Sequence, residues 1–278
     1  MKWLFVLFLA IIIFGGAAWF GYNFVFKEDI QVAKEQRGEV TPEPRIDLSL
    51  PEYEAAAKLR QDGKLPEARA ALTAFVQKYP TSTHADEAKD LLGEINIGIF
   101  LSRTPSPEKE EYIVKPGDVL AKVARKVKTT PELIMRMNNM SGTMLHIGEH
   151  LLVSHPDFAI VVQRKPKLLV VLNHGGFFKQ YHIQEEKLPS KTPSKVTTKV
   201  AEVMAWRDGK RVGFGTKEFI GSTRWVRLAS QAYTIYAVPD SAHQVVQPPP
   251  PQGIGLAAAD VEELGSLVNN KTPVTITE

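Results

Sequence analysis

The longest apolar run of the chain lies at its N-terminus. From Trp3 to Phe26 every residue except Asn23 is apolar or small, and a lysine stands on either side of the run. About 20 apolar residues span a bilayer, whereas a signal peptide has a shorter apolar region of roughly 7–15 residues and a small-residue cleavage site. Only Ala17-Ala18 resembles such a site, and bulky aromatic residues follow it. We therefore predict an uncleaved transmembrane anchor over residues 1–27.

Residues 51–97 carry the spacing of amphipathic helices. Apolar residues recur every three or four positions, and the pattern is interrupted at Asp62-Gly63 and at Tyr79-Pro80. It therefore predicts three short helices, the third capped by Ser82 or Thr83. Charged, proline-containing stretches on either side are predicted to be linkers, at residues 28–50 and 98–111.

A strand, two helices and a second strand are predicted within residues 112–154. A strand-like run begins at Tyr112 and ends in a turn at Gly117-Asp118. Helical spacing follows, and Pro131 occupies a first-turn position at which proline is tolerated in a second helix. A closing strand that ends at Val153 completes a compact βααβ unit.

Beyond residue 158 the pattern changes to that of strands. Leu168–Leu172 and Phe177–Ile183 are strand-like runs, and they flank the hairpin turn signal Asn173-His-Gly-Gly176. The predicted fold class is therefore multidomain α+β. It consists of an N-terminal transmembrane helix, a short α-helical segment, the βααβ module and a C-terminal mostly-β domain over residues 158–278.

Composition and charge narrow the function. Of the 278 residues, 44% are hydrophobic and 23% are charged, which excludes wholesale disorder. A net charge of +3, without any cluster of lysine and arginine, argues against nucleic-acid binding. The absence of cysteine excludes disulfides and thiolate metal sites. Because the seven histidines are dispersed, we expect neither a metal site nor a cofactor.

The helical segment resembles a tetratricopeptide unit. The resemblance is carried by Gly63-Lys-Leu-Pro-Glu-Ala68, by Tyr79-Pro80 and by Glu87-Ala88. It covers little more than one repeat, and such units need about three neighbours to be stable. The segment is therefore expected to pack on another part of the protein. It is either a spacer or a groove that recruits an envelope protein partner.

The βααβ unit resembles a LysM domain along its whole length, from Tyr112-Ile-Val-Lys-Pro-Gly-Asp118 to the closing strand. The resemblance implies binding of peptidoglycan through glycan strands that contain N-acetylglucosamine. In the family the glycan lies in a shallow groove between two loops, where backbone groups bind N-acetyl groups and apolar atoms cover sugar faces. One position departs from the family, because Val119 stands where a serine or threonine is usual. The implied groove residues are Gly117, Asp118, Val119, Leu120, Thr143, Met144, Leu145 and Ile147.

Residues 158–278 resemble the L,D-transpeptidase catalytic domain of the YkuD type. That family cuts and rejoins peptide stems through an acylated cysteine in the motif Ser-His-Gly-Cys-Ile-Arg, with a second histidine in an upstream Ile-His-Gly. Framework residues carry the resemblance here: Ser190-Lys-Thr-Pro193, Asp208-Gly-Lys-Arg211, Phe214-Gly215, Ile220-Gly-Ser-Thr-Arg-Trp225, Asp260-Val-Glu-Glu-Leu264 and Lys271-Thr-Pro-Val-Thr-Ile276.

The reacting groups of that family are missing from this chain. Aligned on the framework, Gly253 occupies the nucleophile position, Pro251 the adjacent histidine, Gly255 the arginine and Tyr236 the upstream histidine. Glycine has no nucleophile, and a phenol that titrates near 10 is a poor base at neutral pH. Prolines 248–251 lack the N–H groups that an oxyanion needs. We predict no catalytic residue and a degenerate, inactive domain.

These expectations combine into a membrane-anchored envelope protein that binds peptidoglycan through LysM. The degenerate domain would serve as a binding or adaptor module, for stem peptides or for a partner. The expected location is the bacterial inner membrane, single-pass, with the soluble part in the periplasm or cell-wall space.

Two alternatives stay open. One is an active L,D-transpeptidase-type enzyme with an unrecognised nucleophile, for which Asp240, Ser241 and His243 are candidates. The other is an envelope scaffold that recruits protein partners through the helical segment. Trp206 and Trp225 are expected to be packing residues rather than sugar platforms.

Overall fold

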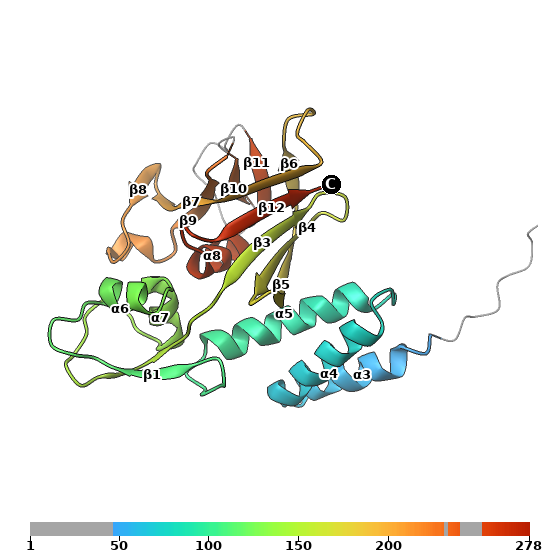
Figure 1. The fold of residues 1–278 in the computed structure, drawn as a ribbon, viewed down its shortest axis with the longest axis horizontal. Coiled ribbons are helices and arrows are strands. Elements are labelled where there is room, and N and C mark those ends of the chain that lie inside the picture. Colours follow the sequence, from blue (N-terminus) through green and yellow to red (C-terminus); the bar gives the residue numbers. More distant parts are fainter. Residues whose placement is uncertain (1–46, 231–232, 240–251) are drawn as a thin grey trace, which may run out of the picture. The chain divides into compact units, whose positions relative to one another are not determined.

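The computed structural model describes residues 47–230, 233–239 and 252–278 (Figure 1). The predicted anchor, residues 1–27, lies outside these ranges, as does most of the predicted linker at 28–50. Within the described ranges, no helix combines the length and the apolar character needed to cross a membrane. Contacts divide the chain into Met1–Leu48 and a second compact unit, Ser49–Glu278, to which all the elements below belong.

Residues 50–101 form three helices: α3 (Leu50–Gln61), α4 (Leu65–Lys78) and α5 (Ala85–Leu101). They enclose a small core of their own that includes Tyr53, Leu72 and Phe75. Gly63 ends the first interhelical turn with a φ of 75°, a conformation that glycine adopts without steric cost. The first two helices therefore end where the sequence predicted.

The third helix corrects two expectations. It continues to Leu101, so the first residues of the predicted linker at 98–111 are helical. The reason is packing, since Ile97 and Phe100 are buried in the core of the C-terminal domain. The N-cap is His84 rather than Ser82 or Thr83. The Ser82 hydroxyl instead accepts a hydrogen bond from the His84 backbone N–H, at 3.0 Å.

Helix α5 packs on strand β5 (Gly176–His182), so the helical segment packs on another part of the protein, as expected. Gly93 allows the close approach, because a Cβ there would lie 3.0 Å from Cγ of Lys179 and 3.2 Å from its Cα. The Asn96 amide donates to the Phe178 carbonyl oxygen at 2.7 Å. A glycine in mid-helix is thus explained by the neighbouring strand rather than by the helix itself.

The βααβ unit forms as predicted, from β1 (Glu110–Ile113), α6 (Leu120–Lys126), α7 (Pro131–Met137) and β2 (His150–Val153). The two strands pair antiparallel, and Ile113 lies opposite His150. Thr130 caps α7, because its hydroxyl accepts a hydrogen bond from the Leu133 N–H at 3.0 Å. The same hydroxyl donates to the Ser266 carbonyl oxygen at 2.7 Å, which ties the start of α7 to the C-terminal domain.

Residues 158–278 are mostly β, as expected. Within the described residues they form a 10-stranded sheet in the order β5-β4-β3-β12-β7-β9-β10-β11-β6, with β8 paired to β7. His174 and Gly175 both have positive φ, which is the two-residue hairpin turn that the sequence indicated between β4 and β5. Helix α8 (Ala258–Leu267) packs against β9, β10 and β11. The remaining elements are β3 (Phe158–Gln163), β4 (Leu168–Asn173), β6 (Glu185–Lys187), β7 (Lys195–Arg207), β8 (Lys210–Val212), η2 (Lys217–Phe219), β9 (Thr223–Leu228), β10 (Thr234–Val238), β11 (Gly253–Ala257) and β12 (Pro273–Thr277).

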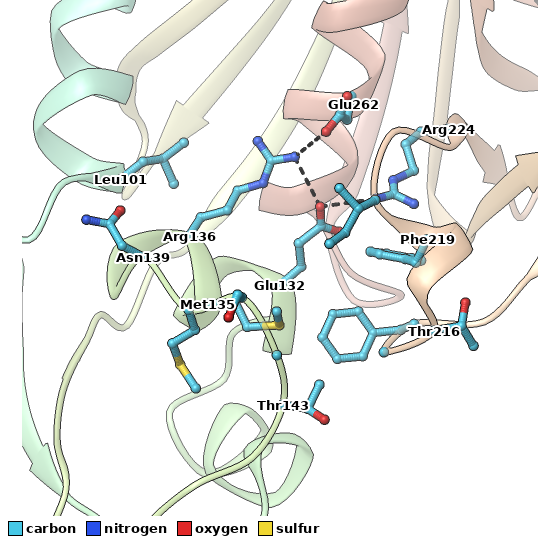
Figure 2. A pocket seen from close by; sticks show the side chains of 16 residues that line it. Leu101, Glu132, Met135, Arg136, Asn139, Thr143, Thr216, Phe219, Arg224 and Glu262 are labelled. Carbon is cyan, nitrogen blue, oxygen red and sulfur yellow. Dashed lines mark hydrogen bonds and ion pairs between the residues drawn. The ribbon is translucent and has the colours of Figure 1, made fainter.

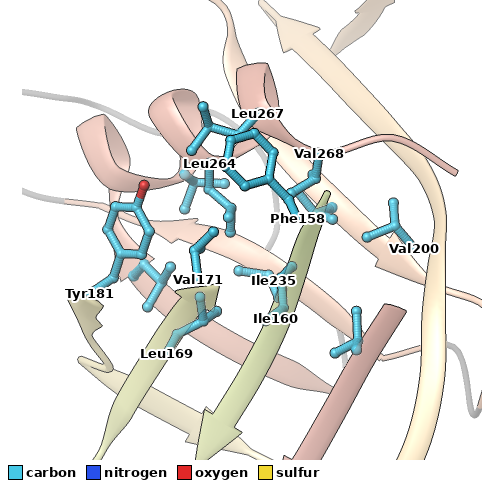
Figure 3. Packing of buried hydrophobic residues seen from close by; sticks show 14 of the residues in the cluster. Phe158, Ile160, Leu169, Val171, Tyr181, Val200, Ile235, Leu264, Leu267 and Val268 are labelled. Carbon is cyan, nitrogen blue, oxygen red and sulfur yellow. The ribbon is translucent and has the colours of Figure 1, made fainter. Parts of the chain in front are cut away.

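The main hydrophobic core lies between the sheet and α8, where Phe158, Leu264 and Leu267 meet (Figure 3). Two residues of α7, Leu133 and Met137, belong to this same core. Their neighbour Ile134 belongs instead to the core of the βααβ unit. Helix α7 therefore buries one face in each of two cores, and the unit cannot be removed without opening the C-terminal domain.

This packing predicts a large effect for Leu133→Ala. The side chain is fully buried, so its truncation should lower the free energy of unfolding by about 2–5 kcal/mol. Met144→Ala is the control within the same unit, because that side chain is 76% exposed and should change stability by no more than about 0.5 kcal/mol. Urea unfolding of both variants measures the difference. Equal free energies of unfolding for the two variants would contradict the burial of α7 in the core of the C-terminal domain.

Candidate functional site

Two loops of the βααβ unit lie side by side at one end of its strands. The backbone N–H of Val114 donates to the Glu149 carbonyl oxygen at 2.9 Å, and the N–H of Gly148 donates to the Val114 carbonyl oxygen at 2.9 Å. Gly117 and Gly148 have φ values of 81° and 83°, so each loop turns at a glycine. The loop that follows β1 and the loop that precedes β2 therefore form one continuous surface.

Apolar side chains project from this surface into solvent. Val119 is 51% exposed, Met144 76% and Ile147 72%. Exposed apolar side chains of this kind can cover a sugar face in a shallow site. Three of the predicted groove residues thus stand where a ligand can reach them.

Three other predicted residues have structural roles. The Leu120 side chain is buried in the core of the unit, so it leaves only backbone atoms for a ligand. Asp118 accepts hydrogen bonds from the Lys115 N–H at 2.9 Å and from the Tyr112 hydroxyl at 2.7 Å. These two bonds lower the pKa of the Asp118 carboxyl. Leu145 packs against the same core as Leu120.

A cavity of about 400 Å³ opens beside the second loop (Figure 2). Helix α7 and the segment 139–143 form one wall, and residues 214–220 with α8 form the other. The two walls meet at Thr143, because a Cβ on Gly215 would lie 3.5 Å from the Thr143 Cγ2. One residue predicted for the groove therefore also lines this cavity.

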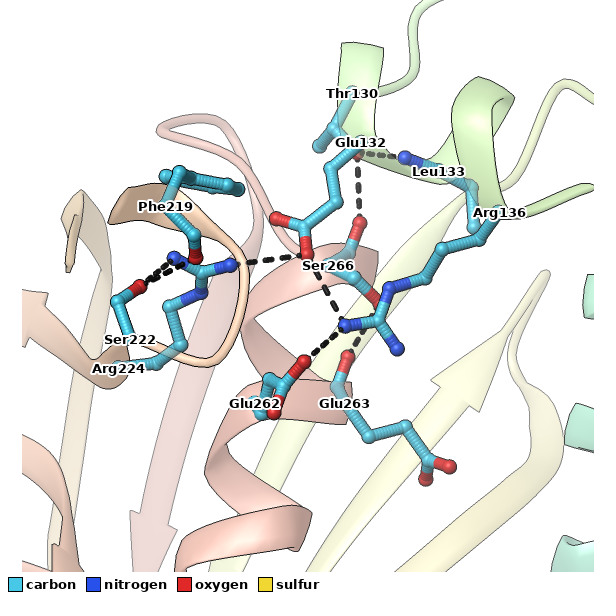
Figure 4. Close-up of polar contacts among 10 residues, drawn as sticks. All are labelled: Thr130, Glu132, Leu133, Arg136, Phe219, Ser222, Arg224, Glu262, Glu263 and Ser266. Carbon is cyan, nitrogen blue, oxygen red and sulfur yellow. Dashed lines mark hydrogen bonds and ion pairs between the residues drawn. The ribbon is translucent and has the colours of Figure 1, made fainter. Parts of the chain in front are cut away.

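Four charged side chains form a network at the cavity wall (Figure 4). Nη2 of Arg136 lies 3.1 Å from Oε1 of Glu132 and 2.8 Å from Oε1 of Glu262. Nη2 of Arg224 lies 3.3 Å from the same oxygen of Glu132. Burial lowers the pKa of Arg224, against the opposing effect of Glu132 and Glu262. An arginine stays protonated nonetheless, so the network holds two positive and two negative charges.

Sequence reasoning did not find this network. Arg224 and Glu262 stand within the framework motifs, but Glu132 and Arg136 lie about 90 and 130 positions away from them along the chain. The guanidinium carbon of Arg224 also lies 3.6 Å from the centroid of the Phe219 ring. An i, i+4 Glu–Arg pair at 132 and 136 was the only available signal, and such pairs are common on exposed helices.

The positions that were predicted to be degenerate come together in the sheet of the C-terminal domain. Strands β10 and β11 are parallel, with Tyr236 opposite Gly255 and Thr234 opposite Gly253. The Tyr236 side chain is buried, and its hydroxyl donates to Oε2 of Glu185 at 2.6 Å. Burial and this bond raise the pKa of the Tyr236 phenol well above its usual value. It is therefore protonated at neutral pH and cannot accept a proton from a nucleophile.

Position 253 has no space for any side chain. A Cβ on Gly253 would lie 2.0 Å from the Thr234 carbonyl oxygen, a backbone atom that cannot move aside without the strand. A Cβ on Gly255 would lie 2.5 Å from Cγ2 of Val238. Position 253 therefore has neither a side chain nor the room for one. Asp240, Ser241, His243 and the prolines 248–251 lie outside the described residues.

The two tryptophans and His150 contact neighbouring side chains. The rings of Trp206 and Trp225 contact one another, with centroids 5.4 Å apart. Nδ1 of His150 lies 2.9 Å from Oε1 of Glu111. In the part of the chain that the structure describes, no three His, Asp or Glu side chains are grouped so as to hold a metal ion.

Comparison with known proteins identifies the βααβ unit. Residues 112–154 match the model of the LysM domain family, so the chain contains a LysM domain. No curated protein sequence matches the chain.

Solved structures similar to the chain include three L,D-transpeptidases. That of Enterococcus faecium is 13% identical with a TM-score of 0.30, and the match covers 48% of this chain and 55% of that one. The Mycobacterium smegmatis enzyme is 11% identical with a TM-score of 0.32, and the match covers 47% of this chain and 64% of that one. An enzyme from Mycobacterium tuberculosis is 16% identical with a TM-score of 0.29, and the match covers 50% of this chain and 66% of that one. The chain thus spans between about half and two thirds of the length of these enzymes.

The closed backbone at position 253 predicts that a cysteine placed there will not restore a nucleophile. Gly253→Ala and Gly253→Cys should each lower the free energy of unfolding by at least about 1–3 kcal/mol, because the added atoms overlap a neighbouring strand. Gly98→Ala is the matched control. No atom lies within 4 Å of a Cβ there, and alanine in a helix should raise stability by about 0.5–1 kcal/mol. A Gly253 variant as stable as the native chain in urea unfolding would contradict this geometry.

Proposed function

We propose that this protein is a membrane-anchored component of the bacterial cell envelope that binds peptidoglycan through its LysM domain. The LysM match over residues 112–154 carries the proposal. The geometry of the domain supports it, because two adjoining loops present Val119, Met144 and Ile147 to solvent. The expected ligand is a glycan strand that contains N-acetylglucosamine.

We further propose that the C-terminal domain acts as a binding or adaptor module without acyl-transfer activity. The absence of cysteine from the chain supports this proposal. So does the clash that any side chain at position 253 would make with the Thr234 carbonyl oxygen. Tyr236, which is protonated at neutral pH, stands in place of a basic histidine and cannot itself activate a nucleophile.

The proposed location is the inner membrane, with the folded part in the periplasm or cell-wall space. The apolar run from Trp3 to Phe26 supports it, since its length suits a bilayer. The folded unit begins at Ser49, so residues 28–48 would connect the anchor to it. A LysM domain can bind peptidoglycan only on the side of the membrane where the cell wall lies, which agrees with a folded part in the periplasm or cell-wall space.

The double variant Met144→Asp, Ile147→Asp tests glycan binding. Both side chains are exposed, so the fold should be unchanged, while two carboxylates replace apolar contacts to sugar faces. Each lost apolar contact is worth about 1.5–3 kcal/mol when fully buried, and about 1.4 kcal/mol corresponds to a tenfold change in affinity. We expect retention of the detergent-purified full chain on isolated peptidoglycan sacculi to fall at least about tenfold.

Leu48→Asp is the matched control, because it makes the same chemical change at a side chain that is 78% exposed and outside the LysM domain. It should leave retention unchanged. Point variants are needed here because deletion of the LysM domain would remove Leu133 and Met137 from the core of the C-terminal domain. Equal retention of the double variant and the native chain would count against the proposed groove.

A further inference from the structure

The cavity adjoins the groove predicted on the LysM loops. Thr143 belongs both to the predicted groove and to the cavity wall. The cavity has a volume of about 400 Å³, which falls in the range of about 300–1,000 Å³ that is usual for small-ligand sites. Because its far wall comes from the C-terminal domain, the cavity exists only where the two domains meet.

Arg136 lines this cavity and has hydrogen-bond donors that its ion pairs do not use. Its ion pairs with Glu132 and Glu262 both use Nη2, and Nη1 and Nε have no partner among the described residues. Figure 2 shows the second terminal nitrogen directed away from Glu132. The Arg136 side chain is 30% exposed, so it is accessible to a ligand. A free guanidinium edge of this kind binds a carboxylate.

Glu262 offers the opposite charge at the same wall. Its Oε1 contacts Arg136, while its Oε2 has no partner in the described part of the chain, and the side chain is 40% exposed. An ammonium group could therefore bind there without displacing Arg136. The cavity thus provides one acceptor and one donor of full charge a short distance apart.

Apolar side chains complete the cavity. Met135 and Met140 line it from the LysM side, and Phe214 and Ile220 line it from the C-terminal domain. Phe214 is 40% exposed and Ile220 66%, which is unusual for large apolar residues. A ligand that covers them would carry methyl or methylene groups between its charged ends.

We propose that this cavity binds the short, zwitterionic peptide stem of a glycan held on the LysM loops, with a stem carboxylate on Arg136 and a stem amino group on Glu262. The inference rests on the proposed function, since it requires a glycan in the adjoining groove. It assigns stem recognition to the junction of the two domains, away from the closed positions Tyr236 and Gly253. The protein would then distinguish peptide-bearing glycan from bare glycan.

The test is an NMR titration of the full chain with two matched probes, the N-acetylglucosaminyl-N-acetylmuramic acid disaccharide with and without its tetrapeptide. We expect the native chain to bind the peptide-bearing probe at least about tenfold more tightly. Arg136→Gln should reduce its affinity to that of the bare disaccharide, and Arg136→Lys should recover part of the difference. Arg125→Gln, an exposed residue on α6 that does not line this cavity, is the control and should change neither affinity.

The outcomes separate the two proposals. If the tetrapeptide adds no affinity, or if Arg136→Gln binds both probes as the native chain does, the cavity proposal is wrong and glycan binding by LysM still stands. If the native chain is not retained on sacculi, the proposed function fails first. Thermal unfolding of each variant shows whether a lost affinity reflects lost folding. An Arg136→Gln variant that keeps the native melting temperature and loses only peptide-dependent binding supports the proposal.

Discussion

Helix α7 has two buried faces, and the rest of the folded unit depends on them. Ile134 packs into the LysM core, while Leu133 and Met137 pack into the core beneath the large sheet. A helix of seven residues is too short to be stable without such packing. Its position also fixes the wall of the cavity, because Glu132 and Arg136 lie on the same helix and bind residues of the C-terminal domain. The LysM domain is consequently one side of a larger structure.

The charged network illustrates how that packing creates a polar site. The Arg224 side chain is 2% exposed, and removing such a charge from water is unfavourable unless it is paired. Glu132 supplies the pairing charge and the Phe219 ring covers one face of the guanidinium. The same Glu132 oxygen also contacts Nη2 of Arg136, so the two arginines share one carboxylate oxygen. The buried charge of one domain is therefore paired by a helix of the other, which places Arg136 at the cavity wall.

Much of the architecture could be predicted from local patterns. The βααβ unit, the hairpin at His174-Gly175 and the helix breaks at Gly63 and Pro80 follow from periodicity and turn residues, which act over a few positions. The extension of α5 to Leu101 could not be predicted, because it depends on the burial of Phe100 against a distant sheet. The cavity could not be predicted for the same reason, namely that it depends on contacts between distant segments. Its walls come from segments far apart in sequence, and single-sequence patterns carry no information on which surfaces meet.

The double role of the Thr130 hydroxyl has a consequence for how the protein would sit against a polymer. It caps α7 and also binds the last turn of α8 through the Ser266 carbonyl oxygen, so the two helices cannot rotate about one another freely. A glycan strand bound to the LysM loops would then have a fixed orientation relative to the C-terminal domain. Such a molecule would hold the polymer at one angle to the C-terminal domain. Two domains joined by a flexible linker would allow that angle to vary.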